Sequence, residues 1–259
     1  MSEPTQPTST SRTSREASRA GLAGRTALVT GASSGIGRSI SLALASRGAT
    51  VWIVGRRPVA LADTAAAGEG AQLRAFTADL SDDGQVAGLC DAVASAGQGL
   101  DTLVHCAGMI ALGTSEQAQV ADFDAQYRSN LRAPFVLTQA LLPMIKTAHG
   151  DIVFVNSTAG LGPRPGVGQY AATQAALRAL TDSLRGEVNA EGVRVLSIFP
   201  GRTATPLQER VHAAEGKNYV PERLLQAEDV AAMVIAALEL PRTAEVTEIV
   251  LRPRVKPPA

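Results

Sequence analysis

The chain has 259 residues, a formal net charge of +0, 45% hydrophobic residues and only 3% aromatic residues. This length allows one or two domains, and the scarcity of aromatic residues requires a core built mainly from Ala, Val, Leu and Ile. The neutral charge argues against a nucleic-acid partner, and no apolar run approaches the roughly 20 residues that span a bilayer. The two cysteines, Cys90 and Cys106, do not make a disulfide framework, and we expect Cys106 to be a reduced, buried thiol.

The first segment, residues 1–21, is rich in Ser, Thr, Arg and Pro and has almost no apolar content. We predict a disordered N-terminal extension, because such a segment cannot offset the entropy lost on ordering. Its Ser and Arg content also resembles an organelle transit peptide, although Glu3, Glu16, Pro4 and Pro7 fit that alternative poorly. The segment lacks the apolar stretch of a signal peptide, which favours a cytoplasmic protein.

Seven short apolar segments follow, and longer helical patterns separate most of them. Strands that are apolar throughout indicate burial on both faces of a sheet, and helical connections imply right-handed crossovers between parallel strands. The predicted strands are 26–30, 51–54, 71–77, 102–105, 152–155, 193–198 and 246–251. The pattern predicts one doubly wound α/β domain over residues 22–259, with a core that ends near residue 252 and a seven-stranded, mainly parallel sheet.

A glycine-rich segment, Thr30–Gly37, follows the first strand and opens a helical pattern. Gly31 permits a sharp turn, Gly35 lets backbone amides approach a pyrophosphate, and Gly37 lets the helix pack on the sheet. The helix N-terminus adds N–H donors and the positive end of its dipole. This pattern predicts a Rossmann fold whose cofactor contacts are Gly31, Ser33, Ser34, Gly35, Ile36 and Gly37, with a purely structural glycine turn as the alternative.

The second strand ends in Gly55-Arg56-Arg57-Pro58, without the acidic residue that would accept a hydrogen bond from the ribose 2′-hydroxyl of NAD. A guanidinium group can instead pair with a 2′-phosphate. We therefore predict NADP(H) rather than NAD(H), with Arg56 as the main ligand and Arg38 and Arg57 as helpers. The alternative is that these arginines are solvated loop residues.

Ser157 follows the fifth strand, and Tyr170 and Gln174 follow it in the segment Tyr170-Ala171-Ala172-Thr173-Gln174. Together with the glycine-rich segment, this order and spacing resemble the serine–tyrosine–lysine pattern of the short-chain dehydrogenase/reductase family. Gln174 stands where the family has its lysine. None of the three lysines, Lys146, Lys217 and Lys256, lies at that position.

The resemblance implies a role for each of these residues. Ser157 would hydrogen-bond the substrate carbonyl or hydroxyl, and Tyr170 would be the general acid in reduction and the general base in oxidation. Asn130 matches the asparagine that steadies a water behind the family's lysine. Gln174 can still hold the nicotinamide ribose by hydrogen bonds, but without a charge it cannot lower the pKa of Tyr170, so oxidation should suffer more than reduction.

The resemblance also implies further cofactor contacts, namely Asp79 and Leu80 on the adenine, Ala107 and Gly108 through their backbone, and Pro200, Gly201, Thr203 and Thr205 on the nicotinamide carboxamide. Asp79 could instead begin the next helix, with Ser81 as its cap. His105 and Cys106 stand where the family has two asparagines, and we expect His105 to be a structural residue at a strand end.

Residues 202–223 are polar and irregular, and the resemblance implies a mobile lid over the substrate. We expect His212 in this segment to be a solvent-exposed helix residue. We also consider that Arg164, in the loop between Ser157 and Tyr170, could approach the site. The helices that hold Asn130 and Tyr170 would pack against a partner's copies in a homodimer or homotetramer, unless their apolar faces only cover the sheet.

The leading hypothesis is an NADP(H)-dependent oxidoreductase that reduces a ketone or related carbonyl of a small molecule, with Tyr170 as the proton donor. One alternative is a repurposed family member that catalyses a non-redox biosynthetic step such as elimination, isomerisation or cyclisation. Another is a catalytically silent NADP(H)-binding protein or sensor. No metal site is predicted.

Overall fold

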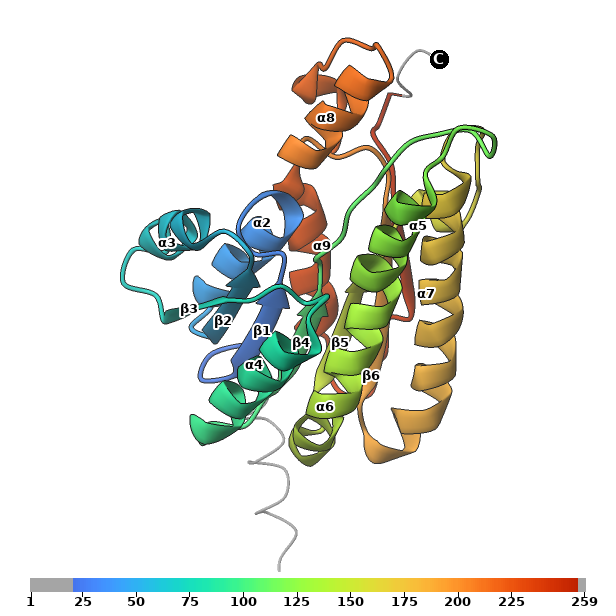
Figure 1. The fold of residues 1–259 in the computed structure, drawn as a ribbon. Coiled ribbons are helices and arrows are strands. Elements are labelled where there is room, and N and C mark those ends of the chain that lie inside the picture. The colour runs from blue at the N-terminus through green and yellow to red at the C-terminus, as the bar shows by residue number, and fades with distance from the viewer. Residues whose placement is uncertain (1–20, 256–259) are drawn as a thin grey trace, which may run out of the picture.

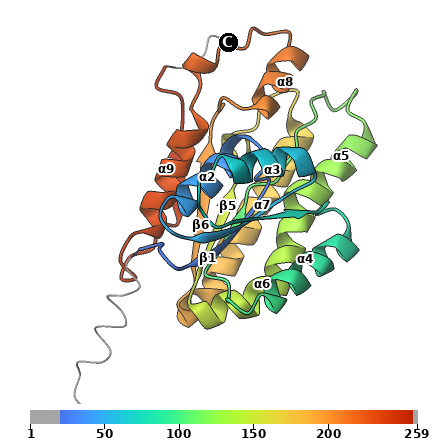
Figure 2. The same cartoon turned by 90° about the vertical axis from the view of Figure 1, so that its left-hand side faces the viewer.

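The computed structural model describes residues 21–255 (Figure 1). The disordered extension predicted for residues 1–21, and the transit-peptide alternative, lie outside these residues except for Gly21. The described chain forms one domain with a central sheet between two layers of helices (Figure 1 and Figure 2). Within it, no helix is both long enough and apolar enough to cross a membrane.

The central sheet has seven strands in the order β3-β2-β1-β4-β5-β6-β7, and every neighbouring pair is parallel. This confirms the predicted doubly wound α/β fold. The order reverses between β1 and β4, which is where dinucleotides bind in such sheets. The strands are β1 (Thr26–Thr30), β2 (Thr50–Gly55), β3 (Leu73–Thr77), β4 (Thr102–His105), β5 (Asp151–Val155), β6 (Arg194–Pro200) and β7 (Glu248–Leu251).

Two groups of helices cover the sheet. One face carries α2 (Gly35–Ala45), α3 (Pro58–Ala66) and α9 (Ala227–Leu238), and the other carries α4 (Asp83–Ser95), α5 (Val120–Tyr127), α6 (Ala133–Ala148) and α7 (Gly168–Val188). Four short turns of helix, η1 (Arg128–Arg132), η2 (Thr158–Gly160), η3 (Asn189–Glu191) and η4 (Pro221–Arg223), complete the connections. Helix α8 (Pro206–Ala214) lies beyond the carboxyl ends of the strands.

The strands are apolar throughout because each one contributes to two cores. Along β1, Ala27 and Val29 pack into the core beneath α2 and α9, whereas Leu28 packs into the core beneath α6 and α7. Side chains alternate between the faces of a strand, so a strand covered on both faces needs apolar residues at every position. Phe154 and Phe199 are the largest fully buried side chains, and aliphatic residues form most of the remaining core.

The edge strands and the lid depart from the predicted pattern. β3 begins at Leu73 and β7 at Glu248, two residues later than predicted in each case, and both are only partly buried. The segment predicted to be irregular contains α8, whose first turn is fixed by a Thr205 side chain that accepts a hydrogen bond from the Gln208 amide at 3.2 Å. Pro206 at the first helical position favours the same start.

Candidate active site

The carboxyl ends of the strands border a cavity of about 720 Å³, which is within the usual range for small-molecule sites. All of the residues predicted as catalytic or in contact with a cofactor line it: Gly31, Ser33, Ser34, Gly35, Ile36, Gly37, Arg56, Arg57, Asp79, Leu80, Ala107, Gly108, Asn130, Ser157, Tyr170, Gln174, Pro200, Gly201, Thr203 and Thr205. Arg38, predicted as a helper, is not among the lining residues. The fold therefore brings residues from nearly the whole chain to one surface, while their individual roles stay predictions.

The glycine-rich segment needs its glycines for close approach. Gly31 has φ +67°, and a Cβ placed there would lie 2.8 Å from the backbone nitrogen of Ala107. Gly35 has φ +54°, and its Cβ would lie 2.8 Å from Cγ2 of Thr205. Side chains at either position would separate this segment from the β4 loop or from the lid. The first turn of α2 contains no acidic residue, and Ser34 makes no side-chain cap, so its N-terminal amides are suited to an anion.

Arg57, rather than Arg56, holds the glycine-rich segment. Its Nη2 donates to Oγ of Ser33 at 3.1 Å and to Oγ of Ser34 at 3.0 Å. The Arg56 side chain is 71% exposed and lies 4.0 Å from a carboxylate oxygen of Asp79. Arg57 is therefore the arginine that the structure fixes beside the glycine-rich segment, while the Arg56 side chain stays exposed at the rim of the cavity.

Asp79 and Leu80 follow β3, and Asp79 shapes a turn there. Its Oδ1 accepts hydrogen bonds from both the amide and the hydroxyl of Ser81, at 3.0 and 2.7 Å. The backbone hydrogen bond from Ser81 is the main reason that the pKa of Asp79 lies below its usual value. The alternative in which Ser81 caps α4 is wrong, since Asp82 caps it by accepting from the Gln85 amide at 3.0 Å.

The end of β4 is held by Thr30 and by a buried histidine. The Thr30 hydroxyl accepts from the amides of Cys106 and Ala107 at 2.9 and 3.1 Å. His105 stacks on Phe154 with ring centroids 4.8 Å apart, and its Nε2 lies 2.8 Å from the Thr138 hydroxyl. Burial lowers the pKa of His105 to about 3, so it is neutral and structural, as expected. Burial also raises the pKa of the Cys106 thiol to about 12.

Ser157 and Tyr170 come together at the cavity. Ser157 ends the extended segment after β5, and its Oγ accepts from the Ala159 amide at 3.1 Å. Tyr170 lies in the first turn of α7. Burial raises the pKa of its phenol, and a hydrogen bond with the Ser157 side chain opposes that rise only in part. The phenol therefore keeps its proton at neutral pH.

Gln174 lies one turn further along α7 and is buried, with 4% of its surface exposed. Its Oε1 is buried and has no hydrogen-bond partner among the described residues. Its backbone is tightly held, because the Asn156 Nδ2 donates to the Gln174 carbonyl at 3.1 Å, and a Cβ at Gly160 would lie 2.9 Å from the Gln174 carbonyl carbon. A buried acceptor that lines a cavity without a partner is suited to a hydroxyl donor of a ligand.

Asn130 lies in the π-helical turn η1 and ties the wall of the cavity together. Its amide pairs with the backbone of Met109, accepting from the nitrogen at 2.8 Å and donating to the oxygen at 2.9 Å. It also donates to the Thr173 hydroxyl at 3.1 Å. The side chain thus joins the β4 loop to α7, and the water-steadying role stays a prediction.

A model of the family described as short chain dehydrogenase matches residues 25–216. The chain belongs to the short-chain dehydrogenase/reductase family.

Similar proteins of this family include one of known sequence and two of known structure. A short-chain type dehydrogenase/reductase of Sinorhizobium fredii is 37% identical over 232 residues, which cover 88% of this chain and 90% of that one. A short chain dehydrogenase of Burkholderia cenocepacia in complex with NADP is 32% identical with a TM-score of 0.78, covering 89% and 97% of the two chains. A variant of actinorhodin polyketide ketoreductase with NADPH is 25% identical with a TM-score of 0.80, covering 88% and 96%.

One sequence expectation for the segment 202–223 of this short-chain dehydrogenase is not met. His212 is buried rather than solvent-exposed, because its ring packs edge-on against Tyr219 and its Nδ1 lies 2.8 Å from the Gln208 carbonyl oxygen. Arg164 lines the cavity and pairs with Glu215 at 2.9 Å, while an influence of its charge on Tyr170 stays a prediction.

Three contributors to this short-chain dehydrogenase site were not assigned roles from the sequence. Asn156 holds the backbone of both Ser157 and Gln174, since its Oδ1 accepts from the Ser157 amide at 2.7 Å. Thr30 positions the β4 loop, and Thr173 receives the Asn130 amide. The available signal was a polar residue at the carboxyl end of an apolar strand, because Thr30 is the last residue of β1 and Asn156 directly follows β5.

Proposed function

We propose that this short-chain dehydrogenase is an NADP(H)-dependent oxidoreductase that reduces a ketone or related carbonyl, with Tyr170 as the proton donor. The observation that carries the proposal is the pairing of Ser157 with a Tyr170 whose pKa is raised by burial. A phenol that keeps its proton is already in the form that a general acid requires. With an uncharged Gln174 beside it, the site favours protonation of a substrate over deprotonation.

The residues present fit a nicotinamide dinucleotide. The backbones around Gly31 and Gly35 leave space that a Cβ would fill, and the start of α2 has amide donors without a side-chain cap. The buried Oε1 of Gln174 can accept from a ribose hydroxyl. When bound, the cofactor would supply the hydride. Gly31–Gly37, Arg57 and Gln174 would hold it.

The preference for NADP(H) is supported by two arginines at the end of β2. Arg57 contacts both serines of the glycine-rich segment, and Arg56 lies at the exposed rim beside Asp79. Together they place two permanent positive charges after β2, where a 2′-phosphate would need them. The similar structures in complex with NADP and NADPH support the same preference.

The chain's own residues then divide the work of reduction. The Ser157 hydroxyl would orient the carbonyl oxygen, and the Tyr170 hydroxyl would donate its proton to that oxygen. Because the pKa of Tyr170 is raised above its ordinary value of about 10, the acid form persists through neutral pH and is lost only in strongly alkaline solution. Oxidation needs the phenolate, so the rate of oxidation should increase as the pH rises from neutral toward the raised pKa of Tyr170.

The test compares wild type with Gln174→Lys in both directions, by stopped-flow measurement of NADPH oxidation with a panel of carbonyl compounds and of NADP+ reduction with the matching alcohols. A lysine would lower the pKa of Tyr170, so oxidation at neutral pH should gain up to about tenfold for each unit by which this pKa falls. Reduction by the wild type should be measurable and flat with pH through neutrality.

Gln169→Lys is the matched control, because it adds the same charge to the same helix at a partly exposed position whose amide donates to the Ala111 carbonyl. If neither wild type nor Gln174→Lys turned over any carbonyl, although NADPH bound tightly, the proposal would fail in favour of a non-redox or catalytically silent protein. The homodimer or homotetramer stays a prediction, which the partly exposed Phe123, Tyr127 and Phe135 of α5 and α6 support.

A further inference from the structure

The wall of the cavity is strongly basic although the whole chain is neutral. Six arginines line it, namely Arg56, Arg57, Arg128, Arg164, Arg202 and Arg210, and Asp79 is the one carboxylate among its described lining residues. The order of the strands separates two pairs of these arginines. Arg56 and Arg57 follow β2, toward one side of the sheet, whereas Arg202 follows β6, toward the other.

The second pair consists of Arg164 and Arg202, which share one carboxylate. The Nη2 of Arg202 donates to both oxygens of Glu215, at 2.8 and 2.6 Å, and the Nη2 of Arg164 donates to one of them at 2.9 Å. Arg164 comes from the loop between Ser157 and Tyr170, Arg202 follows Pro200-Gly201, and Glu215 ends α8. The cluster therefore joins the catalytic loop, the strand end and the lid.

Glu215 does not line the cavity, but both arginines do. Its side chain is 12% exposed and that of Arg202 is 21% exposed. Burial raises the pKa of Glu215, but the hydrogen bonds and charges of Arg202 and Arg164 outweigh that effect and leave the pKa below its usual value. A charged carboxylate therefore lies behind two guanidinium groups and fixes their orientation at the cavity wall.

The cluster carries one positive charge in excess, with two arginines and one glutamate. Among the described residues, the Nε atoms of Arg202 and Arg164 donate to no acceptor, and the remaining contact of Arg202 is a distance of 3.4 Å from its Nη1 to Nε2 of the buried His212. A planar guanidinium with free N–H groups binds an oxyanion well, and a partly buried excess charge favours an anionic partner.

From this geometry we infer that the substrate carries a carboxylate in addition to its carbonyl, and that Arg202 and Arg164 bind it. The inference rests on the proposed reductase function, because it names the substrate class of the same site. A carboxylate is favoured over a phosphate because its single negative charge matches the single excess positive charge of the Arg164–Arg202–Glu215 cluster. The 2′-phosphate of a cofactor does not account for this pair, because Arg56 and Arg57 lie at the opposite side of the site.

The test uses aliphatic oxo acids with increasing separation between carbonyl and carboxylate, each paired with its uncharged methyl ester. Wild type should show a higher kcat/KM for at least one acid than for its ester. Arg202→Gln should reduce the acid-to-ester ratio of kcat/KM by about 10- to 100-fold, as expected for the loss of hydrogen bonds to a charged group. The change should appear mainly in KM, while the dissociation constant of NADPH changes little.

Two further variants keep the test decisive if Arg202→Gln does not fold. Arg164→Gln changes a side chain that is 48% exposed and should reduce the same ratio less strongly. Arg47→Gln removes an exposed ion pair with Glu239, just beyond the ends of α2 and α9, and should leave the ratio unchanged. Equal losses with acids and esters would show that the cluster only holds the lid in place, and this would overturn the inference.

The outcomes also separate this inference from the proposed function. Turnover of esters and neutral ketones without any preference for acids would sustain the reductase and refute the carboxylate site. If no compound is reduced, binding is measured instead, by the change in fluorescence of bound NADPH on titration with the same acids and esters. Tighter binding of an acid that Arg202→Gln abolishes would then sustain the carboxylate site without the reductase, and equal binding of acid and ester would refute it.

Discussion

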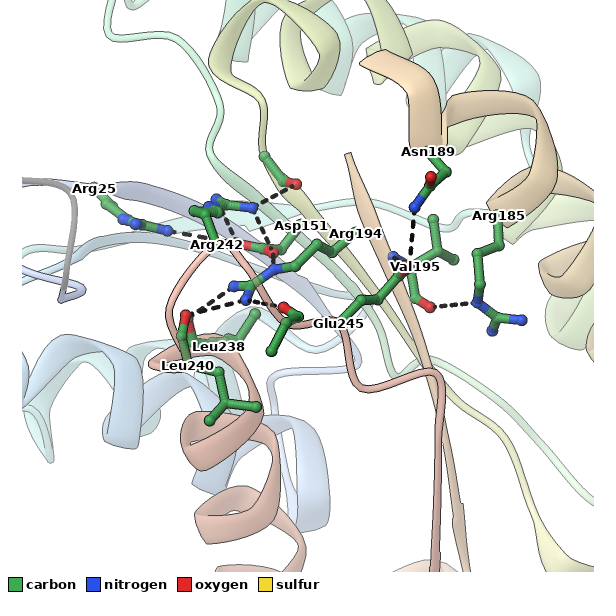
Figure 3. Close-up of polar contacts among 12 residues, drawn as sticks. Arg25, Asp151, Arg185, Asn189, Arg194, Val195, Leu238, Leu240, Arg242 and Glu245 are labelled. Carbon is green, nitrogen blue, oxygen red and sulfur yellow. Dashed lines mark hydrogen bonds and ion pairs between the residues drawn. The ribbon is translucent and has the colours of Figure 1, made fainter. Parts of the chain in front are cut away.

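The two ends of the sheet use charged residues in opposite ways. At the amino ends of β5 and β6, Asp151 is buried and surrounded by three arginines, all of which contact it (Figure 3). At the carboxyl ends, the part of the chain that the structure describes contributes six arginines and a single carboxylate to the lining of an open cavity. One end therefore satisfies its charges within the protein, whereas the other leaves charged groups along the wall of a cavity.

The closed end is a network around Asp151, whose side chain is 3% exposed. Arg194 donates to it at 2.7 Å, Arg242 donates at 3.1 Å to each oxygen, and Arg25 lies at 3.4 Å. Arg194 also donates to the carbonyl oxygens of Leu238, Leu240 and Ala244, which tie the end of α9 and the approach to β7 to the sheet (Figure 3). A buried carboxylate with this many donors is a structural element.

The difference between the two ends of the sheet indicates which charged residues contribute to stability and which contribute to function. A charge whose partners all lie in the chain contributes to folding, and its loss should leave the chemistry of the folded fraction intact. A charge or an acceptor that lines a cavity without enough partners is suited to a ligand. Three substitutions test this division.

The largest effect is expected at the open end. Tyr170→Phe removes the proposed proton donor, and the kcat for carbonyl reduction should fall by about 10²- to 10⁴-fold, while the free energy of unfolding changes little. Steady-state kinetics and urea unfolding measure the two effects. Tyr127→Phe is the matched control, because Tyr127 is partly exposed on α5 and does not line the cavity. Equal kinetic losses in the two variants would contradict the assigned role.

The closed end should show the reverse. Asp151→Ala leaves three arginines without their shared partner, and the free energy of unfolding should decrease by about 3–5 kcal/mol. The kcat of the protein that stays folded should be unchanged. Glu239→Ala, which breaks the exposed pair with Arg47, is the control and should cost about 0–1 kcal/mol. A loss of kcat in the folded Asp151→Ala protein would contradict the purely structural role of Asp151.

The smallest effect concerns the cofactor. Arg57→Gln should raise the dissociation constant of NADPH by about 10- to 100-fold and leave that of NADH nearly unchanged, since only NADPH carries the 2′-phosphate. Fluorescence titration of both cofactors measures this. Arg56→Gln provides the comparison, and a larger effect there would restore Arg56 as the principal ligand, as the sequence alone predicts.

Local patterns were sufficient for the fold and for the position of the site. The strand β1, the glycines after it and the Ser157–Tyr170–Gln174 spacing each lie in a short segment, and the parallel sheet brings strand ends to one edge without further information. The same patterns ranked Arg56 above Arg57 without information on side-chain directions, and in the structure it is Arg57 that contacts Ser33 and Ser34.

Sequence patterns did not predict the contacts between segments that are distant along the chain. Arg164 and Glu215 belong to a loop and a helix end that meet only in the folded chain, so the sequence could not reveal this ion pair. His212 was expected to be exposed because α8 is polar overall, but the helix buries it against Tyr219 and Arg202. The edge strands were predicted too long because Ala71 and Val246 are apolar but lie just outside the paired region.

The way position 174 is held has a consequence for how this site can change. Its neighbours hold the main chain, since Asn156 binds the carbonyl and Gly160 packs against the backbone. These contacts are independent of the side chain, so another residue can replace glutamine without moving Ser157 or Tyr170. A substitution at position 174 can therefore alter the acid–base chemistry of the pocket, while the backbone contacts around this position stay the same.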